Sequence, residues 1–162
     1  MTDEEALAEI LAGLRARLSV LATSHGAELR EAPESEGYGV NGTRFVLHPT
    51  QETATPVSVF TEDAHTVWVE FGLETVDEIF TSPKQVARAV DDVLEVVEAV
   101  AAGRARQRLW YSQTQPEPIG AEAWVQLHEG GKWISFQSWG RVPLRVLQGR
   151  YRAEDVQYSA YS

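Results

Sequence analysis

Histidine is the residue type of this chain best suited to acid–base or metal chemistry near neutral pH. The four histidines are His25, His48, His65 and His128. No two of them have the spacing of zinc ligands, and the His-Glu-x-x-His motif is absent. A Ser–His–Asp set could assemble from Ser58, His65 and Asp63, but Ser58 does not lie in a nucleophile-elbow motif. We therefore predict no catalytic residue and no metal site.

The segment Gly37-Tyr38-Gly39-Val40-Asn41-Gly42 matches the Gly-x-Gly-x-x-Gly pattern of dinucleotide-binding sites. Such a site needs a strand before the glycines and a helix after them, because the helix N-terminus binds the pyrophosphate. Here a stretch rich in proline and glutamate precedes the glycines, and an apolar strand-like segment follows them. We interpret the glycines as turn residues and predict no cofactor.

Adjacent acids occur as Glu62-Asp63, Asp77-Glu78 and Asp91-Asp92. On a strand, neighbouring side chains point to opposite faces, so Asp77 and Glu78 should diverge. Solvated charge is the ordinary role of such pairs. The alternative is an acidic patch for a partner, built from one hairpin-like region of the chain. The residues of this predicted patch are Glu62, Asp63, Glu70, Glu74, Asp77 and Glu78.

Five tryptophans lie in or near the predicted strands. They are Trp68, Trp110, Trp124, Trp133 and Trp139. Aromatic residues serve both packed sheets and interface hot spots, and core packing is the commoner role. Trp68 falls on the polar face of its strand, opposite Val67, Val69 and Phe71. We therefore add Trp68 to the acidic patch as a predicted partner-binding residue. For Trp110 and Tyr111, core packing and partner contact both stay open.

Two amphipathic helices must position these residues. The first is predicted over residues 3–23, from a capping box of Thr2 and Glu5. Its apolar stripe consists of Leu7, Ile10, Leu11, Leu14, Leu18 and Leu21. The second should begin after a Ser82 N-cap, with Pro83 at the first position and Gln85 completing a capping box, and end at Gly103. Its stripe consists of Val86, Val90, Val93, Leu94, Val97 and Val100.

Short strands are predicted on both sides of the second helix, and residues 31–43 are predicted to form turns. The predicted strands cover residues 44–48, 57–60, 67–71, 76–80, 104–111, 124–127 and 133–136. Residues 142–147 should form an edge strand or a loop because of Pro143, and the tail from 151 is ambiguous. We predict a single α+β domain over residues 1–162. It should contain an N-terminal helix, a mostly antiparallel sheet of about six strands, and one long central helix packed on the sheet.

The charge is uneven along the 162 residues. Residues 1–81 hold 15 acids and 4 bases, a net charge of −11, and residues 82–162 hold 9 acids and 10 bases, a net charge of +1. A net charge of −10 disfavours nucleic acids and anionic membranes. It either steers a basic protein partner toward this chain or only keeps the protein soluble. The absence of cysteine excludes disulfides and thiolate sites. The acidic N-terminus and the lack of a 20-residue apolar run predict a cytoplasmic protein.

The run Asp77-Glu78-Ile79-Phe80-Thr81-Ser82-Pro83, with the valine-rich helix to Ala101-Ala102-Gly103-Arg104, resembles small actinobacterial immunity proteins of polymorphic toxins. This resemblance covers about residues 75–111 and implies a non-enzymatic protein that occludes a toxin. The order of elements also resembles that of small acidic secretion chaperones, which bind an extended segment of their cargo. We therefore expect a cytoplasmic binding protein. A small-ligand-binding or enzymatic α+β domain is the remaining alternative.

Overall fold

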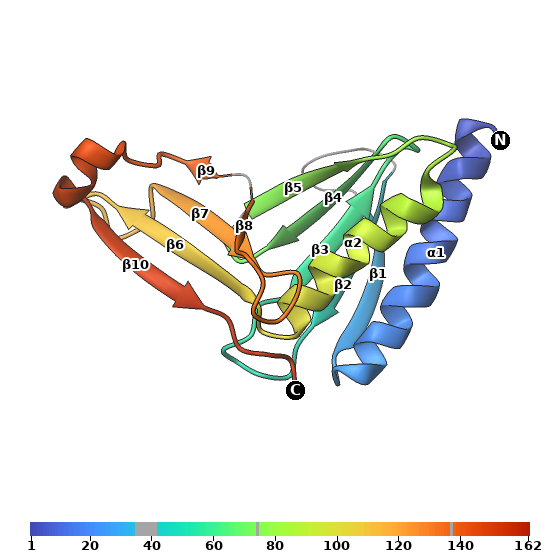
Figure 1. The fold of residues 1–162 in the computed structure, drawn as a ribbon, viewed down its shortest axis with the longest axis horizontal. Helices are drawn as coiled ribbons and strands as arrows, with labels where there is room; N and C mark the ends of the chain where they lie inside the picture. The colour runs from blue at the N-terminus through green and yellow to red at the C-terminus, as the bar shows by residue number, and fades with distance from the viewer. Residues whose placement is uncertain (35–41, 74, 137) are drawn as a thin grey trace.

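The computed structural model describes residues 1–34, 42–73, 75–136 and 138–162. The fold is α+β, as predicted, with two α-helices and two antiparallel sheets in the described part of the chain (Figure 1). The elements are α1 (Asp3–Ser24), β1 (Glu28–Glu34), β2 (Gly42–His48), β3 (Val57–Thr61), β4 (Thr66–Phe71), β5 (Thr75–Phe80), α2 (Val86–Ala101), β6 (Ala105–Tyr111), β7 (Gly120–Val125), β8 (Ile134–Ser135), β9 (Trp139–Gly140), a 3₁₀ helix (Arg145–Arg150) and β10 (Arg152–Gln157). Neither helix is long and apolar enough to cross a membrane within these residues.

Helix α1 begins with the predicted capping box. The Glu5 N–H donates to the Thr2 hydroxyl at 3.2 Å, and the Thr2 N–H donates to the Glu5 carboxylate at 2.7 Å. These bonds satisfy backbone donors that have no partner within the helix. The buried face follows the predicted stripe and consists of Ala6, Ile10, Leu14, Leu18, Leu21 and Ala22.

Helix α2 begins at Val86, and the capping box predicted for Ser82 to Gln85 is wrong. Gln85 is the N-cap and makes no side-chain capping bond. Its N–H donates instead to the carbonyl oxygen of Ser82 at 2.8 Å, so the segment before the helix closes a turn of its own. The central helix packs on a sheet, as predicted, through a valine-rich face that is buried from Val86 to Val100. Packing compensates for the low helix propensity of these β-branched residues.

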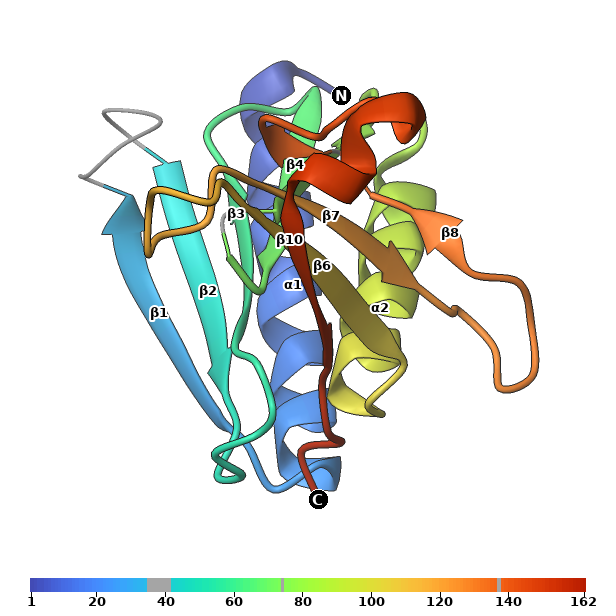
Figure 2. The same cartoon turned by 90° about the vertical axis from the view of Figure 1, so that its left-hand side faces the viewer.

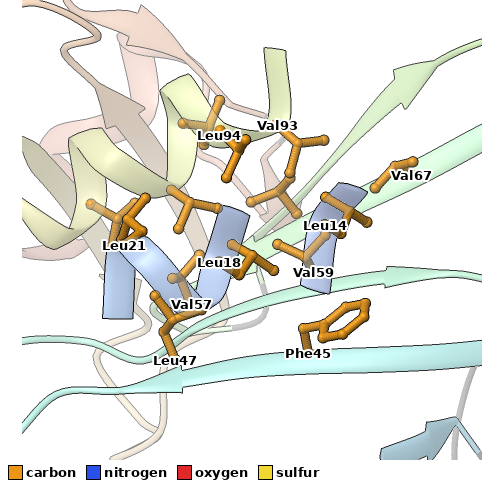
Figure 3. Packing of buried hydrophobic residues seen from close by; sticks show 14 of the residues in the cluster. Leu14, Leu18, Leu21, Phe45, Leu47, Val57, Val59, Val67, Val93 and Leu94 are labelled. Carbon is orange, nitrogen blue, oxygen red and sulfur yellow. The ribbon is translucent and has the colours of Figure 1, made fainter. Parts of the chain in front are cut away.

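The first sheet, sheet A, is a meander in the order β1-β2-β3-β4-β5. Both helices pack against one face of it, and Figure 3 shows the core between them. Leu14 and Leu18 of α1 and Val93 of α2 meet Val57 and Val59 of β3 there. The period-two pattern predicted for β4 is confirmed, because Val67, Val69 and Phe71 are buried and the residues between them are half-buried.

Three strands were not predicted from the sequence, namely β1, the two-residue β9 and β10. The turns predicted over residues 31–43 are wrong at both ends, because β1 covers residues 28–34 and β2 begins at Gly42. Residues 35–41, which carry most of the glycine pattern, lie outside the described residues. Strand β10 forms an edge of the second sheet and is mostly exposed. Because neither β1 nor β10 shows an alternating apolar pattern, their assignment depends on pairing with β2 and β6.

The second sheet, sheet B, has the order β10-β6-β7-β8, with β9 also paired to β7. Figure 2 shows β6, β7 and β10 in front of the two helices. The prediction of one sheet of about six strands is therefore corrected to two sheets with ten strands in the described part of the chain. Residues 142–147 do not form a strand, because the 3₁₀ helix occupies their second half.

The side chain of Gln107 joins the two sheets. It is 1% exposed, and its Nε2 donates to the Leu73 carbonyl oxygen at 3.0 Å and to the Thr75 hydroxyl at 2.6 Å. Its Oε1 accepts the Leu73 N–H at 3.0 Å and the Tyr158 hydroxyl at 2.8 Å. Gly72 lies beside this cluster with φ of +64°, and a Cβ there would lie 2.6 Å from the Tyr158 hydroxyl. The turn between β4 and β5 is therefore fixed by β6 and by the tail after β10.

We predict that Gln107→Leu lowers the free energy of unfolding by about 3 kcal/mol or more. The variant leaves the Leu73 N–H and the hydroxyls of Thr75 and Tyr158 without their partner, and each unsatisfied buried group costs about 1–3 kcal/mol. The matched control is Gln126→Leu, since Gln126 makes an exposed bond to the Gly131 carbonyl oxygen. Urea unfolding should show a change within about 0.5 kcal/mol for the control. Equal losses in the two variants would contradict the role of Gln107.

We also predict a loss of stability in alkaline solution. Burial raises the pKa of Tyr158 to about 12, whereas the unfolded chain loses this proton near pH 10. Above about pH 10 the unfolded state binds fewer protons than the folded state, so the free energy of unfolding falls as the pH rises toward 12. Urea midpoints measured from pH 8 upward should decline less steeply in Tyr158→Phe. Identical slopes would show that Tyr158 ionises in the folded state as it does in the unfolded chain.

Candidate functional site

The predicted acidic patch is divided between the two faces of sheet A. Trp68 pairs with Phe60 and with Glu78, so these three side chains share the face turned away from the helices, which we call the outer face of sheet A. Asp77 pairs with the buried Val69 and therefore lies on the helix side, so Asp77 and Glu78 diverge as predicted. Burial raises the pKa of the Asp77 carboxyl above its ordinary value, although its Oδ1 accepts the Glu78 N–H at 3.0 Å.

The remaining patch residues have separate surroundings. Asp63 shapes the turn between β3 and β4, because its Oδ1 accepts the N–H groups of His65 and Thr66 at 2.8 and 2.9 Å. Glu62 is exposed in the same turn. Glu70 lies on the outer face and forms an ion pair of 2.9 Å with Arg44. Glu74 lies outside the described residues.

Trp68 is half-buried on the outer face of sheet A. Its ring stacks on Phe60 with 5.1 Å between the centroids and 10° between the planes. The Arg44 guanidinium lies 4.4 Å from the Phe60 centroid. The polar-face position predicted for Trp68 is confirmed, and its role as a contact anchor stays a prediction. Trp110 and Tyr111, by contrast, are only 3% and 8% exposed, which indicates packing.

Two of the four histidines contact acids, at separate places in the fold. The His25 Nε2 lies 3.1 Å from the Glu98 carboxylate, and the His65 Nε2 lies 3.3 Å from the Asp3 carboxylate. Within the described ranges, no group of three or more histidine, aspartate or glutamate side chains has the geometry to hold a metal ion.

An open groove of about 660 Å³ lies between α1 and α2, and we call it the helix groove. It is lined by Ala16, Arg17, Val20, Leu21, Ser24, Asp91, Leu94, Glu95 and Glu98. Val20 is 70% exposed beside the buried Leu21, so the apolar surface of α1 extends beyond the part that the core covers. Leu94 of α2 contributes to the other apolar wall and is 7% exposed.

Three carboxylates of α2 border the helix groove. Asp91, Glu95 and Glu98 are four and three residues apart, which places them on one side of the helix. Asp91 pairs with Arg17 at 2.6 Å, and both side chains are more than half exposed. Glu98 contacts His25, whereas Glu95 forms no ion pair in the described part of the chain. The groove therefore combines an apolar floor with a negatively charged border.

Sequence reasoning assigned Asp91 to solvated charge and missed this border. The signal was present in the spacing of Asp91, Glu95 and Glu98 beside Leu94. It could not be recognised without the partner helix, because Val20 lies outside the regular apolar stripe of α1. The groove exists only once the two helices lie side by side.

We predict that Val20→Gln leaves the free energy of unfolding within about 0.5 kcal/mol of the wild type, because the Val20 side chain is mostly exposed. Leu21→Gln, at the next position of the same helix, should cost several kcal/mol, because it buries an amide and removes core packing. Urea unfolding of both variants measures the difference. A large loss of unfolding free energy in Val20→Gln would mean that Val20 packs against other residues of the protein and does not face an open groove.

Comparisons of the chain with known protein families, with curated proteins and with solved structures found no match in any of the three.

Proposed function

We propose that this chain is a non-enzymatic binding protein of the cytoplasm, and that it docks a basic amphipathic helix of a protein partner in the helix groove. The observation that carries the proposal is the acid-bordered apolar groove between α1 and α2. Helix-in-groove recognition needs an apolar trough for anchor side chains and polar borders that select the partner.

The dimensions of the helix groove fit a short helical segment. The lining residues run from Ala16 to Ser24 on α1 and from Asp91 to Glu98 on α2. At 1.5 Å per residue these stretches are about 12 and 11 Å long, which is about two helical turns. An occupant of that length presents two or three apolar anchors at positions i, i+3 or i+4, and i+7. Val20 is the exposed apolar side chain that they would cover.

Charge selects a basic occupant. Asp91, Glu95 and Glu98 face the groove against one arginine, Arg17, so the border keeps a negative charge. Lysine or arginine residues that flank the anchors would pair with these carboxylates at the edge of the interface. The net charge of −10 would raise the association rate of such a partner at low ionic strength.

The leading functional class is inhibition of a toxin, as the resemblance to immunity proteins implies. A bound basic helix belonging to the toxin would be covered, and access to the toxin's active site would be blocked. The second class is a secretion chaperone. The open groove favours this class because it accepts one short segment without needing a folded partner surface.

We predict that a synthetic 14-residue helix of leucine and lysine, with leucine at i, i+3 and i+7, binds the protein more tightly than a peptide of the same composition in scrambled order. Val20→Gln should weaken binding about tenfold, since it places an amide under the anchors. Leu144→Gln is the matched control, because Leu144 is 71% exposed and is not part of the groove lining. Fluorescence anisotropy of the labelled peptide measures each dissociation constant. Equal affinity for the two peptides would contradict helix docking.

A charge reversal separates specific pairing from general attraction. Glu95→Lys should weaken the amphipathic peptide several-fold at low salt, whereas Glu62→Lys makes the same change of charge in the β3–β4 turn, away from the groove lining. Equal effects of the two substitutions would mean that the overall field, and not the groove, attracts the peptide.

The two functional classes differ in stoichiometry. After affinity capture and identification of the native partner, the complex should be examined by light scattering. A 1:1 complex with a folded toxin domain supports inhibition. A dimer of this chain on an unfolded segment supports a chaperone. In either case, Val20→Gln should reduce capture.

A further inference from the structure

One face of sheet B brings arginine and tryptophan side chains together around Arg106. Along β6, the fully buried Ala105 and Gln107 point to one side, so Arg106 and Arg108 lie on the other. We call this second side the outer face of sheet B. The register places Trp124 of β7 beside Arg106 and Glu122 beside Arg108. Arginine and tryptophan therefore adjoin on this face.

Arg106 is held by two indole rings. Its guanidinium carbon lies 4.3 Å from the centroid of Trp133 and 5.3 Å from the centroid of Trp124. Trp133 comes from the segment between β7 and β8. Each cation–π contact restricts the arginine side chain, so part of the entropy cost of binding a ligand is already met in the free protein.

Arg106 forms no ion pair with a carboxylate among the residues that the structure describes, although its charge contributes to lowering the pKa of the Asp155 carboxyl, which pairs with Arg108. Its neighbour Arg108 differs, because its Nε and Nη2 donate to the two oxygens of Asp155 at 2.5 and 2.9 Å. A guanidinium carries five N–H donors in its plane, and stacking on rings leaves those donors available. The guanidinium of Arg106 is therefore held in place by the rings, and its N–H donors are exposed and form no ion pair with a carboxylate in the described part of the chain.

A hollow of about 240 Å³ adjoins Arg106. Its lining includes Arg106, Arg108, Trp124, Asp155 and Gln157. The Gln157 amide is already used, since its Nε2 donates to the carbonyl oxygens of Gly103 and Ala105 at 3.0 Å. Arg108 is balanced by Asp155 and also lies beside Glu122 of β7, whereas Arg106 forms no ion pair in the described part of the chain. The hollow is therefore suited to a single negative group of small size, placed against Arg106.

We propose that the outer face of sheet B binds a carboxylate of a peptide segment, with the Arg106 guanidinium as the bidentate donor and Trp124 and Trp133 as its support. Arginine and carboxylate match in geometry because two parallel N–H···O bonds form at once. The carboxylate belongs either to an acidic side chain or to a chain end. This site is independent of the helix groove, which is lined by other residues and selects the opposite charge.

Three N-acetylated tripeptides test the proposal on the full chain. Acetyl-Ala-Glu-Ala-amide carries a side-chain carboxylate, acetyl-Ala-Gln-Ala with a free end carries a terminal carboxylate, and acetyl-Ala-Gln-Ala-amide carries neither. NMR follows the Arg106 Nε–H and the indole N–H signals of Trp124 and Trp133. We expect saturable shifts with at least one carboxylate peptide, with a dissociation constant on the order of millimolar, and none with the neutral peptide. The tighter of the two carboxylate peptides identifies the source of the group.

Arg106→Lys keeps the charge but removes the planar fork, so the dissociation constant should rise about fivefold or more. Trp133→Ala keeps Arg106 but removes its closer ring, and it should also weaken binding. Arg88→Lys is the matched control, since Arg88 lies exposed on α2 at 3.9 Å from Asp92 and outside the lining of the hollow. The proposal is overturned if the neutral peptide causes the same shifts, if neither carboxylate peptide saturates, or if Arg106→Lys binds as the wild type does.

Discussion

The buried amide of Gln107 is the interaction on which the arrangement of the two sheets depends. Its four hydrogen bonds connect β6 with the turn between β4 and β5 and with the segment after β10. A buried amide is tolerated only when its donors and acceptor are paired, so this cluster admits one relative position of the strands. Gly72 completes the constraint, because a side chain there would displace the Tyr158 hydroxyl. Because Gln107 lies on β6, the same hydrogen bonds also fix where the outer face of sheet B lies relative to sheet A.

The helix groove has a different origin. The two helices bury their stripes against sheet A, and the contacts in Figure 3 use Leu14 and Leu18 of α1 with Val93 of α2. Two cylinders that rest on one sheet leave a trough along their solvent side unless large side chains fill it. Val20, Ala16 and Ser24 are too small to do so, which leaves a hollow where Asp91 and Glu95 project. The same packing that forms the core therefore creates the candidate binding site.

Local sequence patterns predicted those elements whose structure depends only on residues close to one another in the sequence. The capping box of Thr2 and Glu5 and the alternation around Trp68 each depend on neighbouring residues, and both are confirmed. Strand β10 carries no such signal, because its residues are mostly polar and its identity comes from β6, more than forty residues away in sequence. The capping box expected at Ser82 failed because the backbone of Gln85 found a partner in a local turn. The candidate site needed tertiary information for the same reason as β10, since Val20 and Glu95 meet only across two helices.

The pairing of charges explains why the first half of the chain, although it is the more acidic half, does not supply the carboxylates that border the helix groove. Several of its acids are engaged: Glu31 with Arg15, Glu28 with Arg30, and Glu70 with Arg44. The Arg15 guanidinium lowers the pKa of Glu31 by hydrogen bonding to it, which keeps this pair ionised over a wide pH range. The field of such a pair falls off faster with distance than that of a single charge, so paired acids contribute little to steering.

A carboxylate such as Glu95, which forms no ion pair with any residue that the structure describes, acts at longer range on an approaching basic segment. Arg106 is the corresponding cation, because its guanidinium contacts the rings of Trp124 and Trp133 and forms no ion pair with a described acid. The net charge sets only the average attraction, whereas the unpaired groups determine where a partner of each sign can bind.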